Sequence, residues 1–143
     1  MARILIADDS RPIRMLLCRT LAIADHESLE AADGNAALAC LMRERPDVAI
    51  LDVIMPGLSG IDVCLAARAT PELADIGLIF LTGDATSEIV RTAGADYVFA
   101  KPFSPHALLA AIAELTRPNT NATPDAGARP RTRRRRDHAL VLR

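Results

Sequence analysis

Aromatic residues are scarce in this sequence, and lysine is almost missing from it. The 143 residues include no tryptophan, one tyrosine and three phenylalanines, so a hydrophobic core has to be built from Leu, Ile, Val and Ala. Lys101 is the single lysine, because the other sixteen residues counted with it are arginine. Either codon usage left one lysine by chance, or position 101 requires a compact ammonium that reaches a phosphate where a planar guanidinium does not fit.

Long apolar runs are missing as well. No run approaches the roughly 20 residues that span a bilayer, and the opening MARILIADDS places two acids after a short apolar run, unlike a secretory signal. Cys18, Cys40 and Cys64 are widely spaced, without the close pairs that bind zinc. We expect them to be reduced, buried small hydrophobes. Together these features predict a cytoplasmic protein without membrane insertion.

The charges divide the chain into two parts. Residues 1–117 hold ten basic and sixteen acidic residues, a net charge of −6, whereas residues 118–143 hold seven basic and two acidic residues, a net charge of +5. Residues 118–143 are rich in Pro, Asn, Thr, Ala and Arg and show no amphipathic period. We therefore predict one domain over residues 1–117 and a flexible arginine-rich tail over residues 118–143.

Within the first part, apolar runs of strand length alternate with helical patterns. Five short runs rich in aliphatic residues predict strands: residues 3–8, 27–32, 48–52, 78–82 and 97–100. Apolar residues at helical spacing predict helices at residues 11–24, 38–42, 61–65, 87–93 and 105–115. Apolar runs without alternation suit strands that are buried on both faces. The expected fold is α/β, a doubly wound five-stranded parallel sheet with helices on both faces.

Polar residues stand at the ends of four of these strands. They are Asp8 and Asp9, Asp52, Thr82 and Lys101. In an open sheet of this kind, ligands bind in the crevice outside the carboxyl ends of the strands. We therefore expect the three acids, the threonine and the lysine to meet in one place.

The three carboxylates predict a metal site. Asp8, Asp9 and Asp52 would repel one another unless a cation lay among them, and oxygen ligands with open water positions suit Mg²⁺. The alternative interpretation is that one or both acids of the Asp8–Asp9 pair cap the next helix. Likewise, Asp52 and Thr82 taken singly are ordinary strand-end residues.

The combination favours phosphoryl chemistry. A carboxylate such as that of Asp52 acts as a nucleophile, a metal neutralises charge on the phosphoryl oxygens, and Thr82 and Lys101 can hold the remaining oxygens. In this interpretation the lone lysine is a phosphate anchor.

These motifs, taken in order, resemble the receiver domain of bacterial two-component response regulators. The carriers of the resemblance are the pair Asp8–Asp9, Asp52 in LDVIMPGLSG, Thr82–Gly83, and KPF at Lys101. It covers residues 1 to about 117 and implies a flavodoxin-like fold of the chemotaxis-receiver type with no attached output domain. The implied function is a phosphoacceptor that takes a phosphoryl group from a sensor histidine kinase or phosphotransfer protein and then binds a downstream protein target. Such a protein is no ordinary enzyme, although it assists its own phosphorylation and dephosphorylation.

The resemblance also implies individual roles. Asp52 matches the phosphorylated aspartate, and Asp8 and Asp9 match the magnesium-binding acids. The Ile54 backbone carbonyl matches the main-chain metal ligand, and the Gly83 backbone matches a donor to the phosphoryl group. Thr82 and Lys101 match the switch hydroxyl and the phosphate-binding lysine, with a cis peptide expected at Lys101–Pro102.

Two features depart from the family pattern. Thr82 and Lys101 are about three residues closer than usual, most of one helical turn, which predicts a shortened fourth helix and a changed output surface. Val98 stands where the family usually has a switch aromatic, while Tyr97 and Phe99 flank it and should face the opposite side of the strand. Ile54 and Asp84 occupy positions at which the family tunes phosphate lifetime.

Three alternatives remain open at this stage. The chain could be the receiver part of a larger regulator or hybrid kinase. A magnesium-dependent phosphatase with an aspartyl nucleophile usually carries a second acid two residues later, where this chain has Ile54. The arginine run within residues 129–136 has three interpretations: a solvated tail, a salt-sensitive attachment to nucleic acid or an acidic partner, or attraction to the receiver's own acidic face that gates access to Asp52. Nucleic acid binding is therefore expected only through the tail.

Overall fold

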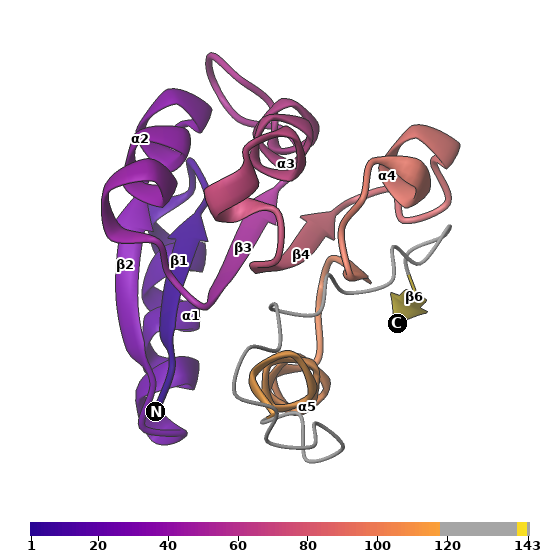
Figure 1. The fold of residues 1–143 in the computed structure, drawn as a ribbon. Helices are drawn as coiled ribbons and strands as arrows, with labels where there is room; N and C mark the ends of the chain where they lie inside the picture. The colour runs from indigo at the N-terminus through magenta and orange to yellow at the C-terminus, as the bar shows by residue number, and fades with distance from the viewer. Residues whose placement is uncertain (118–139, 143) are drawn as a thin grey trace, which may run out of the picture.

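The computed structural model describes residues 1–117 and 140–142, in which a parallel sheet lies between two layers of helices (Figure 1). The strands are β1 (Arg3–Ala7), β2 (Glu27–Ala31), β3 (Val48–Asp52), β4 (Gly77–Thr82), β5 (Tyr97–Ala100) and β6 (Leu140–Leu142). The helices are α1 (Arg11–Ile23), α2 (Gly34–Glu44), α3 (Gly60–Ala69), α4 (Glu88–Thr92) and α5 (Pro105–Thr116), with a 3-10 turn, η1 (Pro71–Leu73), before β4.

The order of strands in the sheet is β2-β1-β3-β4-β5-β6, and every pairing is parallel. The chain winds in opposite directions from β1, which pairs with both β2 and β3. The predicted doubly wound sheet of five strands is thus confirmed. In this topology the order reverses between β1 and β3, the place where such folds bind ligands.

A sixth strand extends the predicted sheet. Leu140–Leu142 lies within the segment predicted to be a flexible tail, yet it pairs along β5, with Leu140 opposite Tyr97 and Leu142 opposite Phe99. The apolar run at residues 139–142 is as short as the predicted strand at residues 97–100, but it stands alone in a polar, arginine-rich segment, so its pattern predicts no strand there. The rest of the predicted tail, residues 118–139 and 143, lies outside the described residues.

Each face of the sheet has its own apolar core. One cluster joins the sheet to α2, α3 and α4, and the other joins it to α1 and α5; α2 and α3 lie on the opposite side of the strands from α5 in Figure 1. Every residue of β3 and β4 is buried. This burial explains why these central strands are continuously apolar in the sequence.

Helix starts follow the predicted signals. Ser10 and Ser104 cap α1 and α5, since their hydroxyl oxygens accept hydrogen bonds from the backbone N–H groups of Ile13 and Ala107. The Asp33 carboxylate caps α2, because it accepts a hydrogen bond from the Ala36 N–H at 2.7 Å. These bonds satisfy N–H groups that have no partner inside the helix.

The structure has the predicted short fourth helix, and Tyr97 and Phe99 face the side of the sheet opposite Val98, as predicted. Helix α4 has only five residues. Val98 packs in the cluster on the α2–α4 face, whereas Tyr97 and Phe99 pack on the α1–α5 face, as strand alternation requires. The cysteines are free; Cys40 and Cys64 are buried, but Cys18 is only partly buried.

Candidate functional site

The register of the sheet brings the strand ends together. Ala7 of β1 lies opposite Leu51 of β3, so Asp8 and Asp52, each one residue further on, reach the same level at the carboxyl edge. Leu81 of β4 lies opposite Asp52. Thr82 lies opposite Ala100 of β5, so the next residue, Lys101, leaves the sheet at the same edge. The predicted meeting of strand ends follows from this register.

Lys101 lies between two buried carboxylates. Its Nζ atom is 3.3 Å from Asp8 Oδ2 and 3.2 Å from Asp52 Oδ2. Asp8 is only 1% exposed and Asp52 only 7%. The Lys101 N–H donates to the Thr82 carbonyl at 2.8 Å, and the Lys101–Pro102 peptide is cis, as predicted. The two ion pairs place the ammonium next to Asp52.

The three acids form one cluster. Asp8, Asp9 and Asp52 each offer a carboxylate oxygen, and these oxygens lie within 4.8 Å of one another. Asp9 is exposed, so the cluster opens to solvent on that side. Two buried carboxylates and one exposed carboxylate form an all-oxygen donor set that suits a hard divalent cation. The alternative of helix capping does not describe this pair, because Ser10 provides the cap of α1.

Burial raises the pKa of the Asp52 carboxyl, and the neighbouring charge of Asp8 adds to the rise. Lys101 and the backbone N–H of Ile54 act in the opposite direction; this N–H donates to Asp52 Oδ1 at 3.4 Å. Both desolvation and a like charge disfavour the ionised form. A cation in the cluster would therefore relieve an unfavourable charge.

The other predicted residues border this cluster. Thr82 is buried, and its hydroxyl oxygen accepts a hydrogen bond from the Asp84 backbone N–H at 3.1 Å. Gly83 has open space where a side chain would be. Ile54 is 79% exposed beside Asp52. The hydroxyl and N–H of Thr86 donate to the Asp84 carboxylate and lower its pKa.

Two residues that shape the site were not identified from the sequence. Arg14 donates from its guanidinium to the Asp8 carbonyl at 2.6 Å. Gly60, the first residue of α3, lies against the main chain of Asp52, where an added Cβ would collide with the Asp52 carbonyl oxygen. A single sequence offers a weak signal for either: a basic residue one turn into α1, and a glycine at a helix start.

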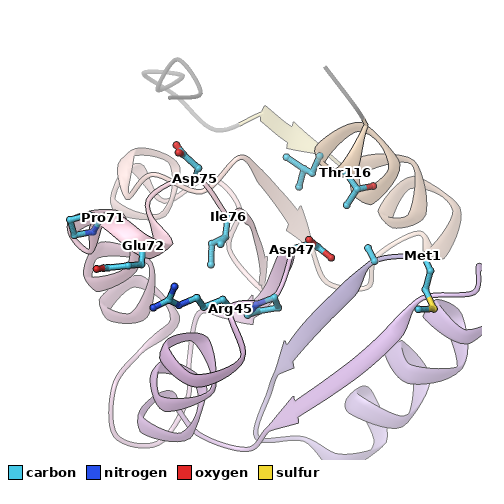
Figure 2. A pocket seen from close by; sticks show the side chains of 11 residues that line it. Met1, Arg45, Asp47, Pro71, Glu72, Asp75, Ile76 and Thr116 are labelled. Carbon is cyan, nitrogen blue, oxygen red and sulfur yellow. The ribbon is translucent and has the colours of Figure 1, made fainter. Parts of the chain in front are cut away.

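A hollow of about 490 Å³ opens at the opposite edge of the sheet. Figure 2 shows its lining side chains, which come from the segments before β1, β3 and β4, from η1 and from the end of α5. Arg45, Asp47, Glu72 and Asp75 are its charged members. Because the hollow lies at the amino ends of the strands, it is distinct from the carboxylate cluster. We assign the functional chemistry to the cluster, where the buried acids and the ammonium converge.

Comparison with known proteins identifies the class. Residues 4–113 match the response regulator receiver domain family. The chain belongs to this family, and it is a response regulator receiver domain of two-component systems. No helix in the described part of the chain is both long and apolar enough to cross a membrane.

Relatives of known name agree with this assignment. The chain is 41% identical over 129 residues to the response regulator MprA of Mycolicibacterium vanbaalenii, covering 88% of this chain and 54% of that protein. It is 43% identical over 113 residues to the probable transcriptional regulator ycf27 of Galdieria sulphuraria, covering 77% and 43%. The chain thus spans about half the length of these curated relatives.

Solved structures share the fold. The chemotaxis response regulator CheY4 of Vibrio cholerae superposes with a TM-score of 0.73 at 35% identity, covering 80% of this chain and 98% of that chain. The response regulator TrrA of Thermotoga maritima, solved in complex with Mg(2+)-BeF, has a TM-score of 0.73 at 33% identity, covering 80% and 99%.

Proposed function

We propose that the chain is a phosphoacceptor in a two-component phosphorelay, in which Asp52 receives a phosphoryl group and thereby changes partner binding. The observation that carries this proposal is the position of the Lys101 ammonium, 3.2 Å from Asp52 and 3.3 Å from Asp8 at the carboxyl edge of the sheet. An ammonium on a flexible stem at this place can pass from the carboxylates to a phosphoryl oxygen.

The donor is a phosphohistidine of a histidine kinase or phosphotransfer protein. An oxygen of Asp52 attacks the phosphorus, a P–O bond forms, and the P–N bond breaks with its electron pair returning to the imidazole nitrogen. Lys101 holds one phosphoryl oxygen, and the Gly83 backbone N–H and the Thr82 hydroxyl donate to others. In the return reaction, water attacks the phosphorus, the bond to the Asp52 oxygen breaks, and inorganic phosphate leaves. The chain thus assists the phosphorylation and the dephosphorylation of its own Asp52, and it does not turn over a separate substrate.

The carboxylate cluster would hold Mg²⁺. Asp8, Asp9 and Asp52 would supply side-chain oxygens, and Ile54 would supply its backbone carbonyl. When bound, the ion would neutralise charge on the phosphoryl oxygens beside these acids. The Mg(2+)-BeF complex of the similar protein TrrA supports this assignment.

Phosphorylation would act as a local charge switch. The new group adds roughly one and a half to two negative charges and three acceptor oxygens. Thr82 can turn toward it once its hydroxyl leaves the Asp84 N–H. Because Thr82 ends β4 and Lys101 directly follows β5, the change would reach the surface of α4, β5 and α5, where a downstream protein would bind. We expect the short α4 and the β6 strand to make this surface specific to the chain.

The test is incubation of the purified chain with acetyl phosphate and Mg²⁺, followed by intact mass measurement. We expect one phosphoryl adduct, which hydroxylamine removes because it is an acyl phosphate. Asp52→Asn should remain unmodified, whereas Asp75→Asn, a matched exposed acid at the opposite edge of the sheet, should be modified like the wild type. A wild-type chain that stays unmodified with Mg²⁺ present would contradict the proposal.

The phosphatase alternative finds no support in the site. The position two residues after Asp52 is the exposed, apolar Ile54, which offers no second acid. The prediction of a tail that binds nucleic acid falls on residues outside the described part of the chain. The absence of an attached output domain stays a prediction, because the chain spans about half the length of the curated relatives MprA and ycf27.

A further inference from the structure

Arg14 links three structural elements directly behind the carboxylate cluster. One guanidinium nitrogen donates to the Asp8 carbonyl oxygen at 2.6 Å, and Nε lies 3.3 Å from Glu30 Oε1. Arg14 belongs to α1, Asp8 follows β1, and Glu30 belongs to β2. The Arg14 side chain is only 15% exposed, whereas the Glu30 side chain is 51% exposed, so the ion pair borders solvent.

We propose that Arg14 is a positioning residue for the Mg²⁺ site: it fixes the main chain at Asp8 so that the Asp8 and Asp9 carboxylates face the cation. This inference rests on the proposed function, because it concerns the metal site that the phosphoryl transfer would use. The side-chain contacts of Arg14 are with the Asp8 carbonyl and the Glu30 carboxylate, not with the carboxylates of the cluster.

The first step of the argument concerns the Asp8 carbonyl. Ladder pairing of β1 ends at Ala7, which lies opposite Ala31 and Leu51. Asp8 keeps one further bond, since its N–H donates to the Ala31 carbonyl at 3.1 Å. Its own carbonyl lies where the chain leaves the sheet, and a buried carbonyl needs a donor. Arg14 supplies that donor as a charge-assisted bond, which is stronger than a neutral one.

The second step concerns the turn that carries the acids. Asp8 Oδ1 accepts from the Ser10 N–H at 2.9 Å, and the Ser10 carbonyl accepts from the Arg14 N–H at 3.0 Å. The main chain and the side chain of Arg14 therefore both tie back to residues 8–10. Asp9 lies between these two anchors. A change in the turn of residues 8–10, which the Arg14 side chain holds through the Asp8 carbonyl, would change the direction of the Asp9 carboxylate.

The third step concerns the sign of the effect. By charge alone, an arginine near the cluster repels Mg²⁺, so removing it should tighten metal binding. By positioning, removing it frees the turn and should weaken binding. Partners that orient metal ligands typically contribute 10- to 100-fold to metal affinity. Because Arg14 acts through the backbone, we expect the lower end of that range, about tenfold.

The test measures Mg²⁺ affinity by isothermal titration calorimetry on the full chain without any phosphoryl donor. Arg14→Gln should raise the Mg²⁺ dissociation constant about tenfold. Arg19→Gln, which removes the same charge from an exposed position five residues further along α1, should leave the constant unchanged or slightly lower it. Urea unfolding with and without Mg²⁺ gives a second readout, because a weaker ligand stabilises the folded state less.

Two further variants keep the test decisive should Arg14→Gln fail to fold. Arg14→Lys retains the charge but lacks the planar fork that reaches the Asp8 carbonyl and Glu30 together, so it should also weaken Mg²⁺ binding. Glu30→Gln leaves the contact with the Asp8 carbonyl in place and should change the constant by less than about twofold, because an exposed ion pair contributes little.

The outcomes separate the two proposals. If the wild type does not bind Mg²⁺, the metal site of the proposed function is wrong. If the wild type binds Mg²⁺ and the folded Arg14 variants bind it equally well or more tightly, the metal site stands and the positioning role of Arg14 is overturned.

Discussion

The Lys101 ammonium lies 3.2 Å from the Asp52 carboxylate, although 49 positions separate the two residues in the chain. The contact is possible because parallel strands β3, β4 and β5 end at one edge. Asp52 is buried and has a raised pKa, so the ammonium compensates only part of the cost of its charge. The pair therefore combines a nucleophile, an anchor for a phosphoryl oxygen and a charge imbalance that a divalent cation would correct.

Removing the ammonium should impair phosphoryl acceptance. In Lys101→Met we expect the rate of modification by acetyl phosphate to fall tenfold to a hundredfold, because a hydrogen bond to a charged group contributes about 1.5–3 kcal/mol. The pKa of Asp52 should rise further, since Lys101 is among the groups that lower it. Intact mass measured over time gives the rate, and ¹³C NMR of the carboxyl carbons gives the pKa direction.

Lys101→Arg is the matched control for this prediction. It keeps the positive charge but replaces the point-like ammonium with a planar fork. We expect Asp52 titration close to that of the wild type together with slower modification. Modification at the wild-type rate would mean that position 101 needs only a positive charge, and that the lone lysine is an accident of codon usage.

Asp52 should make the metal-free protein less stable at neutral pH. Its folded-state pKa is raised, mainly by burial and then by Asp8, so the folded state binds the proton more tightly than the unfolded state. The resulting stabilisation is fully present below the unfolded pKa and is lost as the pH rises through the folded pKa. Asp52→Asn, which cannot ionise, should therefore raise the free energy of unfolding at pH 7 by on the order of 1 kcal/mol.

Urea unfolding without Mg²⁺ at pH 7 and at about pH 3 checks this prediction. The difference between Asp52→Asn and the wild type should shrink at the lower pH, where the unfolded carboxyl is also largely protonated. Asp75→Asn controls for removal of an exposed acid and should change stability by less than about 0.5 kcal/mol. An Asp52→Asn protein that is less stable than the wild type at pH 7 would show that the Lys101 ion pair outweighs burial.

Gly60 should be required for the position of Asp52. An alanine Cβ at residue 60 would collide with the Asp52 carbonyl oxygen, which is main chain and cannot rotate away. We expect Gly60→Ala to lower the free energy of unfolding by about 1–3 kcal/mol, despite a helix-propensity gain of up to about 1 kcal/mol. Gly83→Ala, which meets no atom within 4 Å, should change it by less than about 0.5 kcal/mol. Equal stabilities of the two variants would argue against a close approach at Gly60.

The fluorescence of Tyr97 should change little when the chain is phosphorylated. It is the only tyrosine in a chain without tryptophan, so intrinsic fluorescence at tyrosine wavelengths follows this one side chain. Tyr97 is buried on the α1–α5 face, opposite the side on which Val98 packs. We expect phosphorylation to leave its emission and its quenching by acrylamide unchanged, while unfolding in urea increases the quenching. Increased quenching on phosphorylation of the folded chain would instead indicate that Tyr97 takes the part of the switch aromatic.

Much of the fold could be predicted because hydrophobic patterns are local. The continuously apolar runs at residues 48–52 and 78–82 marked central strands, and Ser10 and Ser104 marked helix starts. Strand β6 could not be predicted in this way. The short apolar run at residues 139–142 is isolated in a polar segment, and the strand within it depends on pairing with the edge of β5.

The candidate site likewise has features that the sequence predicted and features that only the structure shows. By itself, the sequence determined which residues end the strands, and therefore that Asp8, Asp52, Thr82 and Lys101 share one edge, because parallel strands carry their ends to the same side. Only the tertiary structure decided how these groups interact: the raised pKa of Asp52, the Arg14 bond to the Asp8 carbonyl, and the approach of Gly60 to Asp52. Those features depend on burial and on contacts between separate elements, and no local pattern encodes them.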